Sequence, residues 1–360
     1  MRFGLFFFGS HEIPADPGES PYAVLLEAAR FADRNAFEFV STPERHFTRF
    51  GGLFPNPALT SAAIAATTTR VQVRAGSLVP PLSDVVRLVE DWSMVDLISN
   101  GRVGLCFDTG REVDDATAPQ DGYPGRRSPL LRQVDQIRAL WRTRGATGPG
   151  RPGGPHAGSG PLPVWVTAHG HPQSFAGAGR VGVNVLTHLV NTDPQDLAEH
   201  VRDYRKGRTA AGLDPDAGVV TLMQHTYVSD DRADVRAATA ELVSRSGIDP
   251  PFGRCAGPDG GVRTAPAGAH DPVVTPVLRG APRRYAEEHA LLGSVAGCAD
   301  WVRRLAESGV DEIACVVDFV GDPDLFRRGL PGLAALRRAC ADPGGRGPAR
   351  VGPDRYLGWG

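Results

Sequence analysis

Four consecutive side chains of different chemistry follow an apolar run near the start of the chain. Glu44, Arg45, His46 and Phe47 begin three positions after the end of the run 37–41. An imidazole titrates close to neutral pH and can move a proton, while a guanidinium holds a carboxylate through paired hydrogen bonds. Glu44 could orient either neighbour. A plainer interpretation stays open, in which Glu44 and Arg45 form an ion pair at a rim and His46 is structural.

These residues need a scaffold that brings them together, and the chain has a regular one. Near-continuous apolar runs predict strands at residues 2–8, 37–41, 71–79, 103–107, 163–168, 184–189, 219–228 and 312–319. Apolar residues at helical period predict helices at residues 22–35, 58–69, 84–99, 128–142, 172–179, 194–211, 232–244 and 298–308. Eight buried strands alternating with helices predict an α/β fold of the (β/α)8 TIM-barrel type.

A doubly wound open sheet is the alternative architecture. Such sheets usually carry a glycine-rich phosphate turn after the first strand. Here the first strand runs into FGSHEIPADPGE, which contains no G-x-G-x-x-G, and the barrel is therefore favoured. Residues that follow a barrel strand lie at its carboxyl face, so the segment 44–46 is expected to point into the mouth of the barrel.

The sequence predicts one barrel domain over residues 1–340. A segment at 248–282, rich in glycine and proline, is much longer than a usual connection and is interpreted as an insertion after the seventh strand. A second Gly/Pro-rich segment, 143–161, is expected to be a loop on the rim. The tail 341–360 is expected to be disordered.

Composition narrows the cellular setting. The chain has 39 basic and 41 acidic residues, with no Lys/Arg block longer than three, which argues against nucleic acid as a partner. Its five cysteines are odd in number and never in C-x-x-C spacing, so neither a disulfide framework nor a zinc site is indicated. No stretch of 18 apolar residues and no cleavage-site pattern is found. A cytoplasmic protein without a membrane span is expected.

Three long motifs resemble the bacterial luciferase-like flavin monooxygenases, especially the branch found in natural-product biosynthesis. They are PERHFTRFGGLFPNPAL, VQVRAGSLVPPLSDVVRLVEDWSMVDLISNGRVGL and VWVTAHGHPQSFAGAGRVGVNVLTH. The resemblance covers about residues 1–110, 162–228 and 309–333. It implies a (β/α)8 barrel that binds reduced FMN (FMNH2), or the deazaflavin F420 in some branches, at the carboxyl face of the strands. In the oxygenases of this family, dioxygen adds to the reduced flavin ring, and the resulting flavin peroxide attacks the substrate.

The resemblance also implies site residues. The catalytic histidine of the luciferases falls at the position of Arg45, with His46 beside it, and His46 is favoured for handling the proton, with Arg45 and Glu44 completing the catalytic set. The third strand often carries a non-prolyl cis peptide beneath the flavin, here between Gly76 and Ser77. The turn TAHGHPQSF matches the region that holds the FMN phosphate and ends at a helix start, where anions bind readily. The expected cofactor-binding residues are Gly76, Ser77, Asp108, Thr109, Arg111, Thr167, Ala168, His169, Gly170 and His188.

The chain departs from the family pattern after the fourth strand. Branch members typically read FASGWHPNDF there, whereas this chain reads FDTGREVDDATA, with Asp108 in place of a small residue and Arg111 in place of tryptophan. A carboxylate close to an anionic flavin would oppose binding by on the order of 1–3 kcal/mol, which Arg111 could offset. The family's G-T-P-E turn is also replaced, by residues 293–297. An F420-dependent oxidoreductase and a flavin-free barrel with altered chemistry therefore stay open as alternatives.

The remaining expectations concern partners and metals. Because the chain shows no second nucleotide-binding domain, a separate flavin reductase is implied. The expected substrate is a small biosynthetic intermediate, free or tethered to a carrier protein. The helix at 84–99 has apolar residues on more than one face, which predicts a homodimer. The histidines are scattered, with no H-x-H after the first strand and no H-E-x-x-H, so no catalytic metal is expected.

Overall fold

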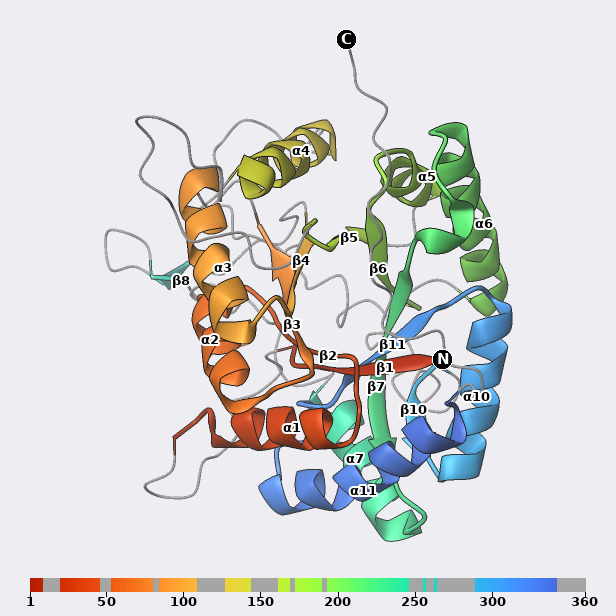
Figure 1. Cartoon of the computed structure of the whole chain (residues 1–360). Helices are drawn as coiled ribbons and strands as arrows, with labels where there is room; N and C mark the ends of the chain where they lie inside the picture. The colour runs from red at the N-terminus through yellow and green to blue at the C-terminus, as the bar shows by residue number, and fades with distance from the viewer. Residues whose placement is uncertain are drawn as a thin grey trace.

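In the computed structural model, parallel strands close into a ring with helices around it (Figure 1). The structure describes residues 1–8, 20–45, 53–79, 84–108, 127–143, 161–168, 172–189, 193–245, 255–256, 262–263 and 289–341. The strands of the ring are β1 (Arg2–Phe6), β2 (Phe39–Thr42), β3 (Gln72–Leu78), β4 (Val103–Phe107), β5 (Val164–Ala168), β6 (Asn184–His188), β7 (Val220–Val228) and β11 (Glu312–Val316). β11 pairs with both β7 and β1, and β6 pairs with β7, so the ring is closed. The predicted (β/α)8 barrel is confirmed.

The helices cover the outside of the ring (Figure 1). They are α1 (Ala23–Arg34), α2 (Pro57–Thr67), α3 (Val85–Ser99), α4 (Arg127–Thr143), α5 (Pro172–Arg180), α6 (Pro194–Ala210), α7 (Arg232–Arg245), α10 (Val295–Glu307) and α11 (Pro323–Ala339), with a 3-10 turn, η2, at Pro215–Ala217. All eight predicted strands and eight predicted helices are present, with ends shifted by a few residues. The helix α11 was not predicted. None of the helices in the described residues is long and apolar enough to cross a membrane.

Several helices begin at the same dipeptide, an aspartate or asparagine followed by proline. Asn56 caps α2 by accepting hydrogen bonds from the backbone N–H groups of Ala58 and Leu59, and Asp193 and Asp322 cap α6 and α11 in the same way. The proline at the first helical position has no N–H to leave unsatisfied. This local signal sets the residue at which each of these helices begins and at which the preceding loop ends.

Alternate residues of each strand face opposite sides of the barrel wall. Leu5, Val73 and Val185 face outward and pack in the core shared with the helices. The interior holds a separate cluster made of Phe6, Phe8, Phe39, Cys106, Trp165, Leu186, Met223, Ala314 and Val316. Because both faces are buried, the strands read as continuous apolar runs in the sequence.

Only part of the predicted insertion lies in the described residues. Within 248–282, β8 (Cys255–Ala256) and β9 (Val262–Arg263) form an antiparallel pair. A further strand, β10 (Leu291–Gly293), was not predicted and pairs in parallel with the end of β7, where Leu291 faces Thr226. Residues 144–160, the rest of the insertion and the tail from 342 onward lie outside the described residues.

Candidate active site

The described side chains that surround the barrel mouth continue the inward-facing pattern of the strands. Each lies two positions after a residue that faces the barrel interior, as Thr167 follows Trp165 and His188 follows Leu186. The group consists of Phe8, Ser41, Gly76, Asp108, Thr167, His188, His225 and Asp318. We call this set the mouth ring. It lies at the carboxyl ends of the strands, which is the face where barrel enzymes carry their active sites.

A buried ion pair lies beneath the mouth ring. Arg74 donates from Nη1 and Nη2 to the two carboxylate oxygens of Glu312, at 2.8 and 3.3 Å. The guanidinium is sandwiched between the rings of Phe39 and Trp165, with its Cζ 3.8 and 4.0 Å from their centroids. Thr221 donates to Glu312 at 2.8 Å and accepts from the Trp165 indole at 3.1 Å. These groups fill the lower barrel, so an open pocket can form only at the mouth.

Charge keeps Glu312 ionised despite its burial. Burial by itself would raise the pKa of Glu312, but the adjacent Arg74 and Arg2 guanidiniums and the hydrogen bonds from Arg74 and Thr221 hold that pKa below its ordinary value. The nearest contact with Arg2 is 3.5 Å. The carboxylate is therefore a structural anion that balances two cations.

Glu44 and Arg45 follow β2 and face different surroundings. Glu44 is only 8% exposed, and its Oε2 accepts a hydrogen bond from the backbone N–H of Val79 at 2.8 Å. Arg45 is half-buried, and its guanidinium carbon lies 4.8 Å from the centroid of the Phe8 ring. Arg45 therefore lies beside the mouth ring, as predicted, and Glu44 contacts the loop after β3. His46 and Phe47 lie outside the described residues.

The predicted cis peptide between Gly76 and Ser77 is wrong, because the described residues contain no cis peptide bond. The pairing of β3 with β4 instead shifts register between Ala75 and Leu78, which marks a bulge at Gly76 and Ser77. The lack of a side chain on Gly76 leaves room for the Phe6 ring, because a Cβ there would lie 2.9 Å from Phe6 Cζ. A flat ligand would therefore approach the backbone from above Phe6.

The other predicted cofactor-binding residues divide into two groups. Asp108, Thr167 and His188 belong to the mouth ring, and the Thr167 hydroxyl lies 3.7 Å from the Cys106 thiol. The Ala168 side chain packs in the core shared with the helices, and its carbonyl accepts a hydrogen bond from Thr187 at 2.8 Å. Ala168 therefore presents no side chain to the mouth. Residues outside the described set are Thr109, Arg111, His169 and Gly170.

Three described residues at or beneath the mouth are not among the site residues selected from the sequence. His225 is 6% exposed, its ring meets Phe319 edge-on at 5.4 Å, and burial lowers its pKa to about 4. Asp318 accepts a hydrogen bond from the Phe8 N–H at 2.9 Å. Burial raises the pKa of the Cys106 thiol, and that thiol stays protonated. The signal that could have identified them is the alternation of strand residues, because each lies at every second position from other side chains that face the barrel interior.

The described mouth combines apolar walls with neutral hydrogen-bonding groups. Phe8 and Val316 supply apolar surface, Ser41 and Thr167 supply hydroxyls, and His225 supplies an imidazole that is neutral at neutral pH. Ring carbonyls and nitrogens of a flat heterocycle such as a flavin match these donors and acceptors. The Asp108 and Asp318 carboxylates are the described groups of the mouth ring that fit an anionic ligand least. The uncharged residues present therefore fit a flavin ring, with these two carboxylates opposing its charge.

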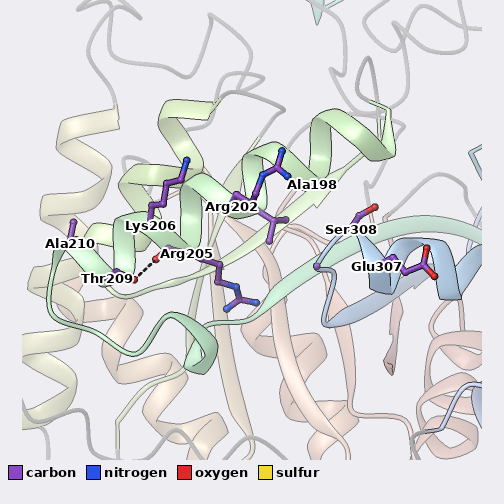
Figure 2. Close-up of a pocket in the computed structure, with 10 residues that line it drawn as sticks. Ala198, Arg202, Arg205, Lys206, Thr209, Ala210, Glu307 and Ser308 are labelled. Carbon is purple, nitrogen blue, oxygen red and sulfur yellow. Dashed lines mark hydrogen bonds between the residues drawn. The ribbon is translucent and has the colours of Figure 1, made fainter.

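A groove of about 700 Å³ lies on a different part of the barrel, between α6 and the end of α10. Figure 2 shows Arg202, Arg205 and Lys206 along α6, across from Glu307 and Ser308. Each cation has an acidic partner: Arg202 with Glu199 at 3.5 Å, Arg205 with Asp311 at 2.8 Å and Lys206 with Asp203 at 3.3 Å. The groove borders the segment that leads into β11, so it lies at the amino end of the strands, opposite the mouth.

In the part of the chain that the structure describes, no group of three or more histidine, cysteine, aspartate or glutamate side chains is arranged to hold a metal ion. Free thiols are found at Cys106, Cys298, Cys315 and Cys340.

Comparison with known proteins adds to this geometry. Residues 1–312 match the model of a family described as luciferase-like monooxygenase. The oxygenase component of the flavin-dependent trigonelline monooxygenase of Acinetobacter baylyi is 27% identical over 260 residues, which cover 67% of this chain and 69% of that protein.

Solved structures share the fold at low sequence identity. Monooxygenase RslO1 of Streptomyces bottropensis has a TM-score of 0.71 and 22% identity, covering 94% of this chain and 98% of its own. The oxygenating constituent of 3,6-diketocamphane monooxygenase from a Pseudomonas putida plasmid, solved with FMN, has a TM-score of 0.69, 16% identity and coverage of 95% and 98%. An F420-dependent secondary alcohol dehydrogenase, solved with an F420–acetone adduct, also has a TM-score of 0.69 and 16% identity, with coverage of 95% and 99%. At these identities the structures show the fold alone.

Proposed function

The chain belongs to the luciferase-like monooxygenase family, and we propose that it is the oxygenase component of a two-component flavin monooxygenase. In this proposal it takes reduced FMN from a separate reductase and uses dioxygen to oxygenate a small biosynthetic intermediate, free or carried on a protein. The relative from Acinetobacter baylyi, itself named an oxygenase component, supports the division of labour between two proteins.

The observation that carries the proposal is the composition of the mouth ring. Hydroxyls from Ser41 and Thr167 and the neutral imidazole of His225 surround a mouth whose inner wall is aromatic and aliphatic. A bound flavin would supply the activation of dioxygen. The chain's own contribution would be to orient the ring, exclude water and hold protons, which requires apolar walls with few ionised groups.

Two residues of the loop after β2 are proposed to act on the reacting atoms. Arg45, beside Phe8, supplies a fixed positive charge that can pair with oxygen atoms of the cofactor or the substrate. His46, its neighbour in the sequence, is proposed to hold and release the proton, because imidazole is the side chain suited to this near neutral pH. Gly76, Ser77, Asp108, Thr167, Ala168 and His188, with Thr109, Arg111, His169 and Gly170 that follow β4 and β5, are proposed to surround the cofactor.

Anaerobic titration with FMNH2 tests the proposal, followed by mixing with aerated buffer. We expect binding at micromolar concentrations and then a transient absorbance that differs from that of oxidised FMN. The His46→Ala variant should bind FMNH2 with unchanged affinity and lose the oxygenation. Absence of FMNH2 binding at tens of micromolar would contradict the proposal, and normal turnover by His46→Ala would contradict the proton role of His46.

A second candidate is an F420-dependent oxidoreductase. Its support is the F420-dependent alcohol dehydrogenase, which has the same TM-score as the FMN-bound monooxygenase. Such an enzyme would transfer hydride and would not need dioxygen. Titration with F420, followed through its absorbance near 420 nm, separates the two candidates because only one cofactor should bind tightly. If neither cofactor binds, the flavin-free alternative is favoured.

We also propose a homodimer formed through α2 and α3. Large apolar side chains are exposed on these adjacent helices, with Leu59 at 70%, Met94 at 58% and Ile98 at 49% exposure. Clusters of this kind mark contact surfaces more often than free surface. Sedimentation analysis of wild type and Met94→Lys should give a dimer and a monomer respectively, and a monomeric wild type would contradict the proposal. The free thiols agree with a reducing compartment, and we propose the cytoplasm.

A further inference from the structure

We propose that Glu44 is a positioning residue that clamps the bulge in β3 by accepting a backbone hydrogen bond, and that it does not carry a proton. This inference rests on the proposed function, because the bulge forms one wall of the proposed flavin site. It separates Glu44 from its neighbours Arg45 and His46, to which the proposed function gives roles at the reacting atoms.

Two hydrogen bonds connect Glu44 to the chain that leaves β3. The carboxylate Oε2 accepts from the backbone N–H of Val79 at 2.8 Å, and the Glu44 backbone N–H donates to the Ser77 carbonyl at 3.2 Å. Both partners lie within three residues of Gly76. Since Glu44 is 8% exposed and Val79 is 7% exposed, water cannot easily replace these bonds.

The same bulge is held from its other side by β4. The backbone N–H of Asp108 donates to the Leu78 carbonyl at 2.8 Å. Val79 directly follows the last residue of β3, so its N–H lies beyond the ladder with β4 and takes its partner from another segment. Glu44 provides that partner, and the exit of β3 is fixed between β2 and β4 at the rim of the mouth.

The clamp also bears on Arg45, which directly follows Glu44. The backbone N–H of Arg45 donates to the Phe54 carbonyl at 2.9 Å. The guanidinium of Arg45 lies over the Phe8 ring, with its Cζ 4.8 Å from the ring centroid. Loss of the Glu44 side chain should therefore loosen both the bulge and the position of Arg45.

Two substitutions separate an acceptor role from a charge role. Glu44→Gln keeps the length of the side chain and an oxygen that can accept from Val79, but it removes the charge and the titration. Glu44→Asp keeps the charge but shortens the side chain by about one C–C bond of 1.5 Å, which takes the oxygen beyond hydrogen-bond distance of Val79. A positioning role predicts that Gln is tolerated and Asp is not, whereas a charge or proton role predicts the reverse.

The experiment measures two quantities for each variant. Amide hydrogen exchange of Val79 in the flavin-free protein reports the clamp, and fluorescence titration with FMN reports the site. For Glu44→Asp we expect both the exchange rate and the dissociation constant to rise at least about tenfold, and for Glu44→Gln both should stay within about threefold of wild type. Glu27→Gln, in a surface pair with Arg327, is the control that should change neither. Circular dichroism checks that each variant is folded.

Two outcomes would overturn the inference. The first is weaker FMN binding in Glu44→Gln than in Glu44→Asp, which would make the charge the important property. The second is an unchanged Val79 exchange rate in Glu44→Asp. If wild type binds neither FMNH2 nor F420, the proposed function fails and the role of the clamp in a flavin site falls with it. The exchange rates would then still decide whether Glu44 holds the bulge.

Discussion

Breaking the buried ion pair beneath the mouth should cost far more stability than breaking a similar pair on the surface. The Glu312 side chain is 1% exposed, and its carboxylate receives hydrogen bonds from Arg74 and Thr221. In Glu312→Ala, the Arg74 guanidinium would stay charged between two aromatic rings without its carboxylate. Removing one partner of a buried pair costs about 3–5 kcal/mol. We expect a loss of this size in the free energy of unfolding at pH 7.

Urea denaturation of matched variants measures this loss. Glu27→Ala breaks a pair of the same chemistry, in which Arg327 Nε lies 3.1 Å from the carboxylate, but both side chains are more than one-third exposed. Exposed pairs contribute about 0–1 kcal/mol. A double variant, Arg74→Met with Glu312→Leu, removes both charges and should regain most of the stability that Glu312→Ala loses.

The dependence on pH gives a second check of the same pair. Because the folded-state pKa of Glu312 is held below its ordinary value of 4.5, the carboxylate contributes stability above that pH. The contribution is lost as the pH falls through the lowered folded-state pKa. The stability difference between wild type and Glu312→Ala should therefore shrink in acid. Equal losses for Glu312→Ala and Glu27→Ala, or a double variant no more stable than the single one, would refute this account.

Three further predictions follow from the described contacts. Between pH 6.5 and about 4 the unfolded chain binds a proton at His225 that the folded chain excludes, so wild type should lose up to roughly 3 kcal/mol as the pH falls. His225→Phe should flatten this part of the pH–stability curve, and an unchanged curve would contradict the lowered pKa. Asp108→Asn should tighten FMN binding about 5- to 150-fold in fluorescence titrations by removing like-charge repulsion, and unchanged affinity would place the carboxylate away from the cofactor. Gly207→Ala should destabilise by about 1–3 kcal/mol in thermal melts, because its Cβ would lie 2.5 Å from the Ala176 carbonyl oxygen. Gly177→Ala is the control, since its nearest neighbour is 3.9 Å away and it should be neutral or stabilising; equal effects would refute the close approach of α5 and α6.

The fold could be predicted from the sequence because a closed parallel barrel leaves a strong local signal. Its strands are buried on both faces and read as apolar runs, and the helices α2, α6 and α11 begin at Asp-Pro or Asn-Pro caps. The helix α11 carries such a cap at Asp322, but Pro331 in its interior weakens the helical pattern. The strand β10 is only three residues long, too short to give a period.

The candidate site could be predicted only in part, because its contacts depend on ring closure. Arg74 and Glu312 are 238 residues apart in the chain and meet because β3 and β11 face the same interior. No local pattern marks such a pair. The cis peptide at Gly76 was implied by resemblance, and the structure has a bulge there because β3 and β4 change register. Motif transfer therefore predicted a cis peptide where the backbone has a bulge.

Two buried groups at or beneath the mouth are unsuited to exchanging a proton near neutral pH. Burial lowers the pKa of His225 to about 4 and raises that of Cys106. Glu44 is engaged by the Val79 amide. His188 of the mouth ring and His46, which is proposed to hold the proton, are then the imidazoles to compare, because imidazole is the side chain suited to proton transfer near neutral pH. A rate that depends on pH near neutrality should therefore respond to substitution of one of these two histidines.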